Sequence, residues 1–231
     1  MERIDIDALY DERGDVSWTR PRIQGDVFRD IVLPGFGEDV QIVQVIAHPC
    51  AMRRGPDLAE RVTVAPVLSY PLVEDGGNKG WDGHLKRMPL ADLCEDGEHY
   101  ATRFEDVTAA ASTLLTHDRR IASLSNRGIY VLQQRLIKHY TRLTVDIPTL
   151  RKQSAPVLEE AEQERDWIET ILDGEQLTVE TIRAQSNAFD EWLSAGDPSR
   201  RDLLRRDENH RDIRRQAHAE AGERARQRRS S

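Results

Sequence analysis

The chain has 231 residues, 38% of them hydrophobic, and its 41 acidic side chains outnumber 33 basic ones, which gives a formal net charge of −8. This length suits one domain plus a sizeable appendage, and the hydrophobic content is low for a single compact globule. No apolar run reaches the roughly 18 to 20 residues that span a membrane, and the charged start has no secretory hydrophobic stretch. We therefore expect a cytoplasmic protein with no membrane partner, whose Cys50 and Cys94 are reduced and buried.

Charge is unevenly distributed along the chain. From Arg200 onward there are eleven arginines and six acidic residues, a balance of +5, so the first 199 residues carry −13. An acidic body repels nucleic acid unless it has a local basic groove. The arginine-rich tail is either a solvated helical face or a segment that contacts RNA, an acidic partner or the body itself.

Six short strands are predicted in the first 125 residues. Residues 1–21 alternate too weakly to be more than an N-terminal arm, with Trp18 as a docking residue. Runs rich in β-branched residues and bounded by turn residues predict strands, whereas 51–60 is expected to be a polar loop and 76–83 a glycine-rich turn. The predicted strands are 27–33, 40–47, 61–69, 84–93, 100–109 and 119–125.

An amphipathic helix follows the last predicted strand. Its apolar positions recur at steps of three and four, and Ser125 or Asn126 can cap it. The apolar face consists of Ile129, Leu132, Leu136, Tyr140 and Leu143, and the face expected in water carries Arg135, Lys138 and Arg142. Short strands at this spacing, closed by one helix, favour a small barrel over a parallel α/β sheet.

The composition changes after Asp146. Apolar spacing predicts helices at 157–172 and 179–193, which can form a hairpin with Trp167 and Trp192 as packing residues or binding anchors. From Ser199 onward the pattern is charged nearly all round, which predicts a single solvated helix or a partly disordered segment.

Three stretches resemble, in order and spacing, the PemK/MazF-like toxins. They are GDVFRDIVLPG from Gly25, VTVAPVLS from Val62, and the run from Arg103 to Leu143. The resemblance covers residues 24–143 and implies an α+β fold, namely a small SH3-like antiparallel β-barrel closed by a C-terminal helix and followed here by an α-helical extension. The expected organisation is an N-terminal arm at 1–21, a barrel domain at 22–145 and the helical extension at 146–231.

The same resemblance implies where a ribonuclease site would lie. The family places an arginine just before its second strand, where a guanidinium suits phosphate and developing charge. Glu38 and Asp39 occupy that stretch here, so the arginine is missing. A threonine or serine after the proline of the third strand maps to Ser69, or the match falls on Leu68 and is absent.

Other side chains offer substitutes for the missing arginine. His48 ends the second strand beside Cys50, and Arg53 and Arg54 follow, so we assign catalysis to His48, Arg53 and Ser69. Nucleic-acid binding is assigned to Arg29, Arg53 and Arg54. His48 fits a structural hydrogen-bonding role as well, Cys50 is either a nucleophile or a buried apolar residue, and Arg29 can simply be a surface residue of its strand.

No metal or cofactor is expected. His48, Cys50, His84, Cys94, His99 and His117 lack the tight ligand pairs of structural zinc sites, and no phosphate-cradling glycine loop is present. Two functions remain. The first is a binding module for RNA or for a protein such as an antitoxin, in a toxin–antitoxin or phage-defence type system, with catalysis lost. The alternative is an active, metal-independent endoribonuclease that cleaves single-stranded RNA. Relatives often pair, which implies a homodimer, and the C-terminal helices are the expected interaction element.

Overall fold

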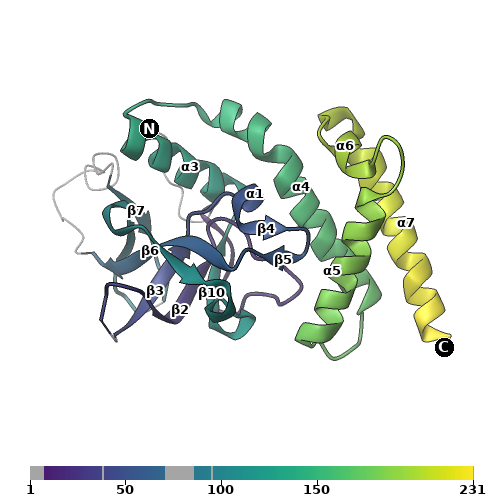
Figure 1. Ribbon diagram of the computed structural model, residues 1–231, viewed down its shortest axis with the longest axis horizontal. Coiled ribbons are helices and arrows are strands. Elements are labelled where there is room, and N and C mark those ends of the chain that lie inside the picture. The colour runs from purple at the N-terminus through teal and green to yellow at the C-terminus, as the bar shows by residue number, and fades with distance from the viewer. Residues whose placement is uncertain (1–7, 38, 71–85, 95, 231) are drawn as a thin grey trace. The chain divides into compact units, whose positions relative to one another are not determined.

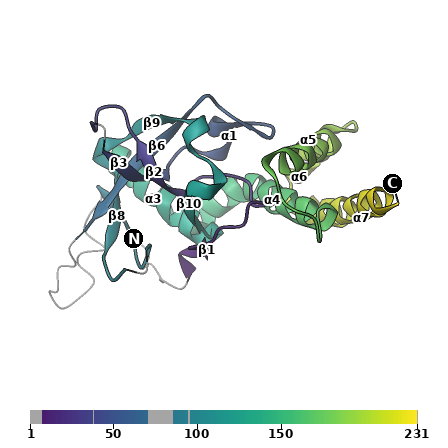
Figure 2. The same ribbon diagram turned by 90° about the horizontal axis from the view of Figure 1, so that it is seen from below.

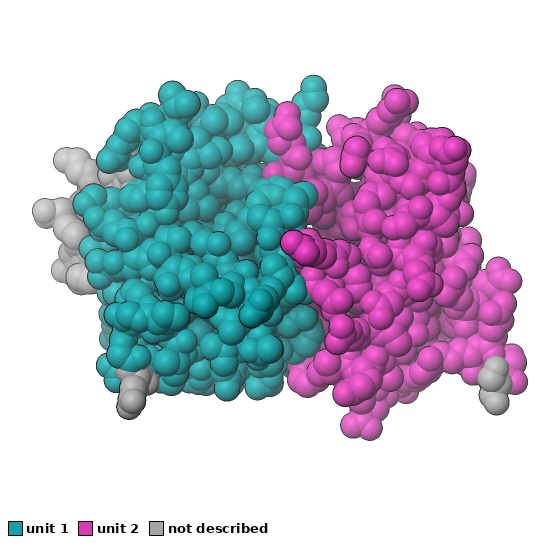
Figure 3. Space-filling model, in the orientation of Figure 1, with its two compact units in different colours: residues 1–16, 22–52, 58–152 teal, residues 17–21, 53–57, 153–231 magenta. Residues whose placement is uncertain are grey.

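The computed structural model describes residues 8–37, 39–70, 86–94 and 96–230. The chain divides into two compact units, which Figure 3 colours separately. The sheet unit comprises residues 1–16, 22–52 and 58–152, and the helical unit comprises 17–21, 53–57 and 153–231. Within the described residues, no helix has both the length and the apolar character needed to cross a bilayer. The glycine-rich turn expected at 76–83, the start of the fourth strand at His84, and Glu38 lie outside the described residues.

The sheet unit is built on a curled antiparallel sheet (Figures 1 and 2). Its described strands follow the order β1-β10-β2-β3-β6-β8-β7, and β9 also pairs with β6. They are β1 Tyr10–Arg13, β2 Val27–Val32, β3 Val40–Val45, β6 Arg61–Ser69, β7 Arg87–Leu90, β8 Tyr100–Arg103, β9 Thr108–Ala111 and β10 Arg120–Leu124. Strand β6 is central because it pairs with β3 on one edge and with β9 and β8 on the other. The predicted α+β class is confirmed.

Apolar side chains of β2, β3 and β6 meet inside the curl of the sheet. Their β-branched and aromatic side chains suit a pleated surface that is buried on one face. The cluster consists of Phe28, Ile31, Leu33, Val43, Val45, Met52, Val62, Val64, Ala110 and Leu115. This core fixes the register of the three strands, since a shift by one residue would turn each apolar set toward solvent.

Most predicted strands are confirmed, and one needs a local correction. Strands predicted at 27–33, 40–47, 61–69 and 119–125 match β2, β3, β6 and β10 within two residues. The strand predicted at 100–109 is interrupted by a 3-10 helix, η2 Phe104–Asp106, so its two halves, β8 and β9, pair with different parts of β6. Two further 3-10 helices, η3 Ser112–Leu114 and η4 His117–Arg119, lead into β10.

The segment expected to be a polar loop at 51–60 is ordered instead. It contains the end of helix α1 Pro49–Met52 and a hairpin of β4 Arg53–Arg54 with β5 Asp57–Leu58. Proline at the first position of α1 is preorganised for a helix. Gly55, with φ of 60°, makes the turn between the two short strands. The loop prediction was wrong because turn residues such as Gly55 were taken as a sign of a loop, whereas they also allow two short strands to pair.

The predicted N-terminal arm is also more than an arm. Strand β1 pairs antiparallel with β10, and the Ser125 amide and hydroxyl donate to the carbonyls of Leu9 and Ala8. Gly128 allows this approach, because a Cβ at that position would lie 2.3 Å from the Leu9 carbonyl oxygen. Trp18 lies in the helical unit, where it packs against the apolar core, so its docking role is confirmed.

Helix α3 Asn126–Thr141 follows β10 directly, as predicted, and contacts β10 and β7. Ser125 caps it by accepting the Gly128 amide at 3.0 Å. The face assignment needs two corrections. Arg135, expected in water, is fully buried and donates to the Arg87 carbonyl at 3.1 Å, whereas Tyr140 and Leu143, expected in the core, are exposed. Arg142, with φ of 63°, ends the helix after Thr141, so Leu143 lies beyond its last turn.

The helical unit packs four helices around one aromatic core. They are α4 Ile147–Ile171, of which residues from 153 belong to this unit, α5 Val179–Ser194, α6 Arg200–Leu204 and α7 His210–Arg229, with the 3-10 helix η5 Asp207–Asn209 between the last two. The rings of Trp167, Phe189 and Trp192 lie 5.6 to 6.0 Å apart, an aromatic contact distance. Both tryptophans are therefore packing residues, and α4 and α5 confirm the two predicted helices.

The solvated tail predicted after Ser199 was wrong. Helices α6 and α7 bury Leu204, Ile213, Ala217 and Ala221 in the same core as Trp167. Alanines at steps of four form a narrow apolar stripe that a reading based on large apolar residues misses.

Candidate functional site

Asp26, the acidic residue of the Gly-Asp pair that opens β2, lies fully buried inside the sheet unit. Its carboxylate accepts hydrogen bonds from Arg120 Nη1 at 3.2 Å, Ser123 Oγ at 2.5 Å and the Ile23 amide at 3.0 Å. The Asp26 and Arg120 side chains are both 0% exposed. Gly25 has φ of 94°, and a Cβ there would lie 2.8 Å from Leu124, so glycine is required. The Gly-Asp pair therefore holds β2 to β10 and cannot touch a substrate.

A second set of buried polar side chains comes from α3, β3, β8 and the segment before β2. Gln24 donates to the Ile46 carbonyl and accepts from Gln133 of α3, both at 2.8 Å. Thr102 of β8 donates to Gln44 of β3 at 2.7 Å. All four side chains are buried. Satisfied networks of this kind fix a unique core arrangement, and sequence reasoning missed this one because isolated glutamines indicate a surface.

His117 is held neutral beside two arginines. Its Nδ1 lies 3.5 Å from Arg120 Nη2, and because a guanidinium only donates, the imidazole accepts. Burial, followed by the charges of Arg120 and Arg22, lowers the pKa of His117 to about 3. A group with this pKa cannot serve as a general acid near neutral pH, and it is a weak base.

The structure places His48 and Ser69 at opposite ends of the β3–β6 pair. Pairing of Val45 with Val64 and of Ile42 with Val67 puts Ser69 level with the start of β3, whereas His48 lies beyond its end. The five steps from Val64 to Ser69 alone correspond to roughly 16 Å of strand. One phosphate cannot reach both side chains within hydrogen-bond distance.

His48 and Ser69 each have a local partner. His48 Nδ1 accepts the Cys50 amide at 3.3 Å, and burial lowers the pKa of His48. In the neutral ring this bond leaves the proton on Nε2, which makes His48 a donor rather than a base. Ser69 Oγ donates to Glu98 at 3.4 Å on an exposed surface. These are structural contacts of the kind that the alternative interpretation of His48 anticipated.

The arginines proposed to bind phosphate belong to different units of the chain. Arg53 and Arg54 form β4 and belong to the helical unit, where Arg53 Nη2 lies 2.8 and 3.1 Å from the two carboxylate oxygens of Glu164. Arg54 is exposed. Arg29 is an exposed residue of β2 whose guanidinium lies 3.8 Å from Asp30. Of these, Arg53 is the arginine most firmly engaged by a carboxylate.

Both cysteines are free, but the expectation that they are buried was wrong. Cys50 is exposed on α1, and Cys94 is partly buried, with burial raising the pKa of its thiol. Helix α1 buries Pro49 and Met52, which leaves Cys50 and Ala51 on its exposed side. Across the described part of the chain, no three His, Cys, Asp or Glu side chains gather as a metal site would require.

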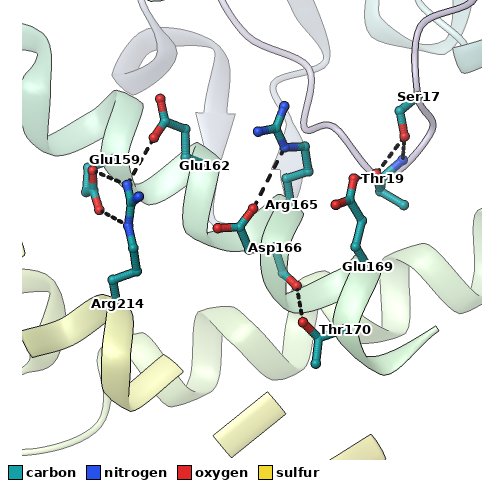
Figure 4. A network of polar contacts seen from close by, with 9 residues as sticks. All are labelled: Ser17, Thr19, Glu159, Glu162, Arg165, Asp166, Glu169, Thr170 and Arg214. Carbon is teal, nitrogen blue, oxygen red and sulfur yellow. Dashed lines mark hydrogen bonds and ion pairs between the residues drawn. The ribbon is translucent and has the colours of Figure 1, made fainter. Parts of the chain in front are cut away.

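The tail arginines pair with acidic residues of their own unit. Arg214 of α7 contacts Glu159 at 2.8 Å and Glu162 at 3.1 Å, as Figure 4 shows. Three further arginines form four such pairs: Arg201 with Glu160 and with Asp190, Arg228 with Glu175, and Arg229 with Asp173. The sequence left RNA, an acidic partner and the body of the chain as possible contacts of the arginine-rich tail. The structure shows ion pairs between the tail and the body.

No family model matches this chain, and no curated protein matches it. The resemblance to PemK/MazF-like toxins accordingly rests on the three quoted stretches.

Proposed function

We propose that the chain is a PemK/MazF-like binding module of a toxin–antitoxin or phage-defence type system, with catalysis lost. The observation that carries this proposal is the separation of His48 from Ser69 along β6. Metal-independent RNA cleavage needs a base and a charge-stabilising donor around one phosphate. The bond to His48 Nδ1 and the Arg53–Glu164 ion pair remove the two groups that could fill these roles.

The fold part of the proposal is an SH3-like barrel closed by α3. Its support is the antiparallel order of the strands, the position of β6 between three partners, and the direct passage from β10 into α3. Such barrels bind partners through loops and strand ends at their rims.

A protein is the partner that we propose, rather than RNA. The sheet unit contains 17 basic and 22 acidic side chains, a balance of −5, which repels a polyanion and attracts a basic protein. At one end of its sheet, Val32 of β2 pairs with Val40 of β3, and both are exposed, at 46% and 60%. We propose this valine pair as the apolar part of the contact, because exposed apolar side chains ringed by charge suit a protein interface.

The first experiment tests for catalysis. Purified full-length protein is incubated with mixed single-stranded RNA, beside His48→Ala and Ser69→Ala variants. We expect no cleavage above the background of a mock purification. Cleavage that disappears in either variant would overturn the proposal and establish the endoribonuclease.

The second experiment tests the partner. The product of the adjacent gene is co-expressed with the chain, and complex formation is measured by size-exclusion chromatography with light scattering. We expect a complex that Val40→Asp disrupts and that the matched control Val179→Asp, at a 55% exposed position of α5 in the helical unit, leaves intact. A complex insensitive to Val40→Asp, or no complex at all, would refute the proposed surface.

A further inference from the structure

The stretch where α3 passes into α4 reverses the charge of the sheet unit (Figure 1). We call residues 138–152 the α3–α4 junction. It contains four basic residues and one acidic residue, a balance of +3, in a unit whose balance is −5, so the rest of that unit carries −8. The four basic residues are Lys138, Arg142, Arg151 and Lys152. A local basic surface on an acidic body favours a partner of the opposite charge.

The fold makes no use of these four charges. Their side chains have no ion pair, hydrogen bond or ring contact with any described residue, whereas every other lysine and arginine described in the sheet unit has a partner. The three that follow Lys138 are exposed. The single carboxylate of the junction, Asp146, accepts the Thr149 amide at 2.8 Å at the start of α4. The four cations are therefore available to a ligand.

The junction folds back along the end of α3. Gln134 Nε2 donates to the Val145 carbonyl at 2.7 Å, and Lys138 follows Gln134 by one turn on the same face of the helix. The Arg142 amide donates to the Lys138 carbonyl at 3.0 Å. These contacts place Lys138 and Arg142 beside the segment that leads into α4, whose first turns carry the other two cations.

Exposed apolar side chains accompany the charges. Leu143 is 65% exposed and Tyr140 is 59% exposed. The Tyr140 hydroxyl donates to the Phe104 carbonyl at 3.3 Å, which holds the ring against the 3-10 helix η2. The two carboxylates of η2, on Glu105 and Asp106, each pair with a basic side chain, at 2.7 and 3.0 Å, so they leave the charge of the junction unchanged. The junction thus combines free cations with apolar surface.

We propose that the α3–α4 junction binds a short acidic amphipathic segment of a protein. Carboxylates of the segment pair with the four cations, and its apolar side chains cover Leu143 and Tyr140. The sheet unit would then offer this surface to an acidic partner and the valine pair to a basic one. The proposal stands whether or not the valine pair binds a protein.

A nucleic acid fits the junction less well. The exposed aliphatic side chain of Leu143 gains from apolar contact, which a phosphate backbone does not supply. A long polyanion would also extend past the junction over a surface that carries −8. Charges on a surface act over a Debye length of about 8 to 10 Å, so a short acidic segment meets the basic junction without that repulsion.

The test is fluorescence anisotropy of a labelled helical peptide with leucine on one face and glutamate on the other, titrated with the full-length protein. A second peptide, with glutamine in place of each glutamate, controls for apolar binding. We expect the glutamate peptide to bind, and to bind more weakly when the Debye length falls from about 10 Å in 0.1 M salt to about 3 Å in 1 M salt. Arg142→Glu and Arg151→Glu should each weaken binding about fivefold, and Leu143→Ser about tenfold.

The matched control is Arg226→Glu, which makes the same charge change at an exposed arginine of α7 whose side chain also has no partner among the described residues. It should leave peptide binding unchanged. Thermal melting establishes that each variant is folded, and Arg151→Glu keeps the test decisive if Arg142→Glu, at the left-handed residue that ends α3, perturbs the helix.

Three results would overturn the proposal. The first is no binding of the glutamate peptide, or equal binding of the glutamine peptide. The second is binding that the junction variants leave intact or that Arg226→Glu weakens equally. The third is tighter binding of single-stranded RNA or of anionic lipid vesicles than of the peptide, lost in Arg142→Glu, which would assign the junction to phosphate groups.

Discussion

Replacing His117 by glutamine should remove a large part of the acid sensitivity of the sheet unit. Burial of the histidine, followed by the charges of Arg120 and Arg22, lowers its pKa in the folded chain from 6.5 to about 3. The unfolded chain therefore binds a proton between pH 6.5 and pH 3 that the folded chain does not. Stability must fall as the pH decreases through this window, and it is unaffected by His117 above it.

The magnitude follows from the two pKa values. At pH 5 the unfolded imidazole is almost fully protonated and the folded one almost fully neutral, a difference of about 1.5 logarithmic units in the protonation equilibrium. Each unit is worth about 1.4 kcal/mol, so the folded state of the natural chain should lose about 2 kcal/mol through His117 between pH 7.5 and pH 5.

Urea denaturation followed by far-ultraviolet circular dichroism measures this loss. The free energy of unfolding is determined at pH 7.5 and at pH 5 for the natural chain and for His117→Gln. Other titrating groups are common to both proteins and cancel in the comparison, and the measurement at pH 7.5 isolates any effect of the substitution on packing. Equal losses in the two proteins would show that His117 titrates normally and would refute the buried arrangement beside the two arginines.

Three further substitutions test the packing. Asp26→Ala leaves its arginine partner buried and unpaired, and should cost about 3 to 5 kcal/mol of unfolding free energy; a loss below about 1 kcal/mol would contradict the buried pair. Gly128→Ala places a Cβ 2.3 Å from a carbonyl oxygen and should lower the melting temperature. Its control Gly222→Ala, whose Cβ has no atom within 4 Å, should raise the unfolding free energy by about 0.5 to 1 kcal/mol. A stability change of the same sign at both glycines would count against the close approach at Gly128. Ala221→Leu overpacks the helical core and should lower the unfolding free energy measured in urea by about 1 to 3 kcal/mol, whereas Ala219→Leu on the exposed face should leave it nearly unchanged. Similar losses in the two variants would mean that this face of α7 is not packed against the core.

Periodicity was sufficient for the strands and the helix that carry large apolar residues. Runs such as 40–47 and 61–69 are β-branched, so local preference and burial agree there, and the elements were predicted within two residues. The strand in the N-terminal arm and the hairpin in 51–60 were not predicted, because β1 and the β4–β5 hairpin are short and depend on their pairing partners. Strand pairing joins residues far apart in the chain, which a local window does not contain.

The candidate site shows the same limit. Ser69 was chosen from its place in a family motif, and His48 and Arg53 were chosen because they lie close together along the chain after the second predicted strand. Register along β6 then separates His48 from Ser69, and Arg53 pairs with Glu164, which is 111 residues away. The buried partnership of Asp26 with Arg120 spans 94 residues and has no local signal beyond the glycine before it.

One feature of the helical unit, the packed face of α7, could have been predicted from the sequence. Ile213, Ala217, Ala221 and Ala225 follow at steps of four and are all buried. Counting alanine as an apolar position would have predicted a helix with a packed face instead of a solvated tail.

The alanine stripe of α7 also determines the order in which the helical unit can become complete. Helices α4 and α5 are synthesised first, and the core around Trp167 stays uncovered until the stripe through Ala221 has been made. The 49 residues from Leu172 to Ala221 take roughly 2 to 10 s on the ribosome. During that interval the exposed aromatic face is open to aggregation or to chaperones, so the yield of folded protein should respond to growth temperature and translation speed more than its final stability would suggest.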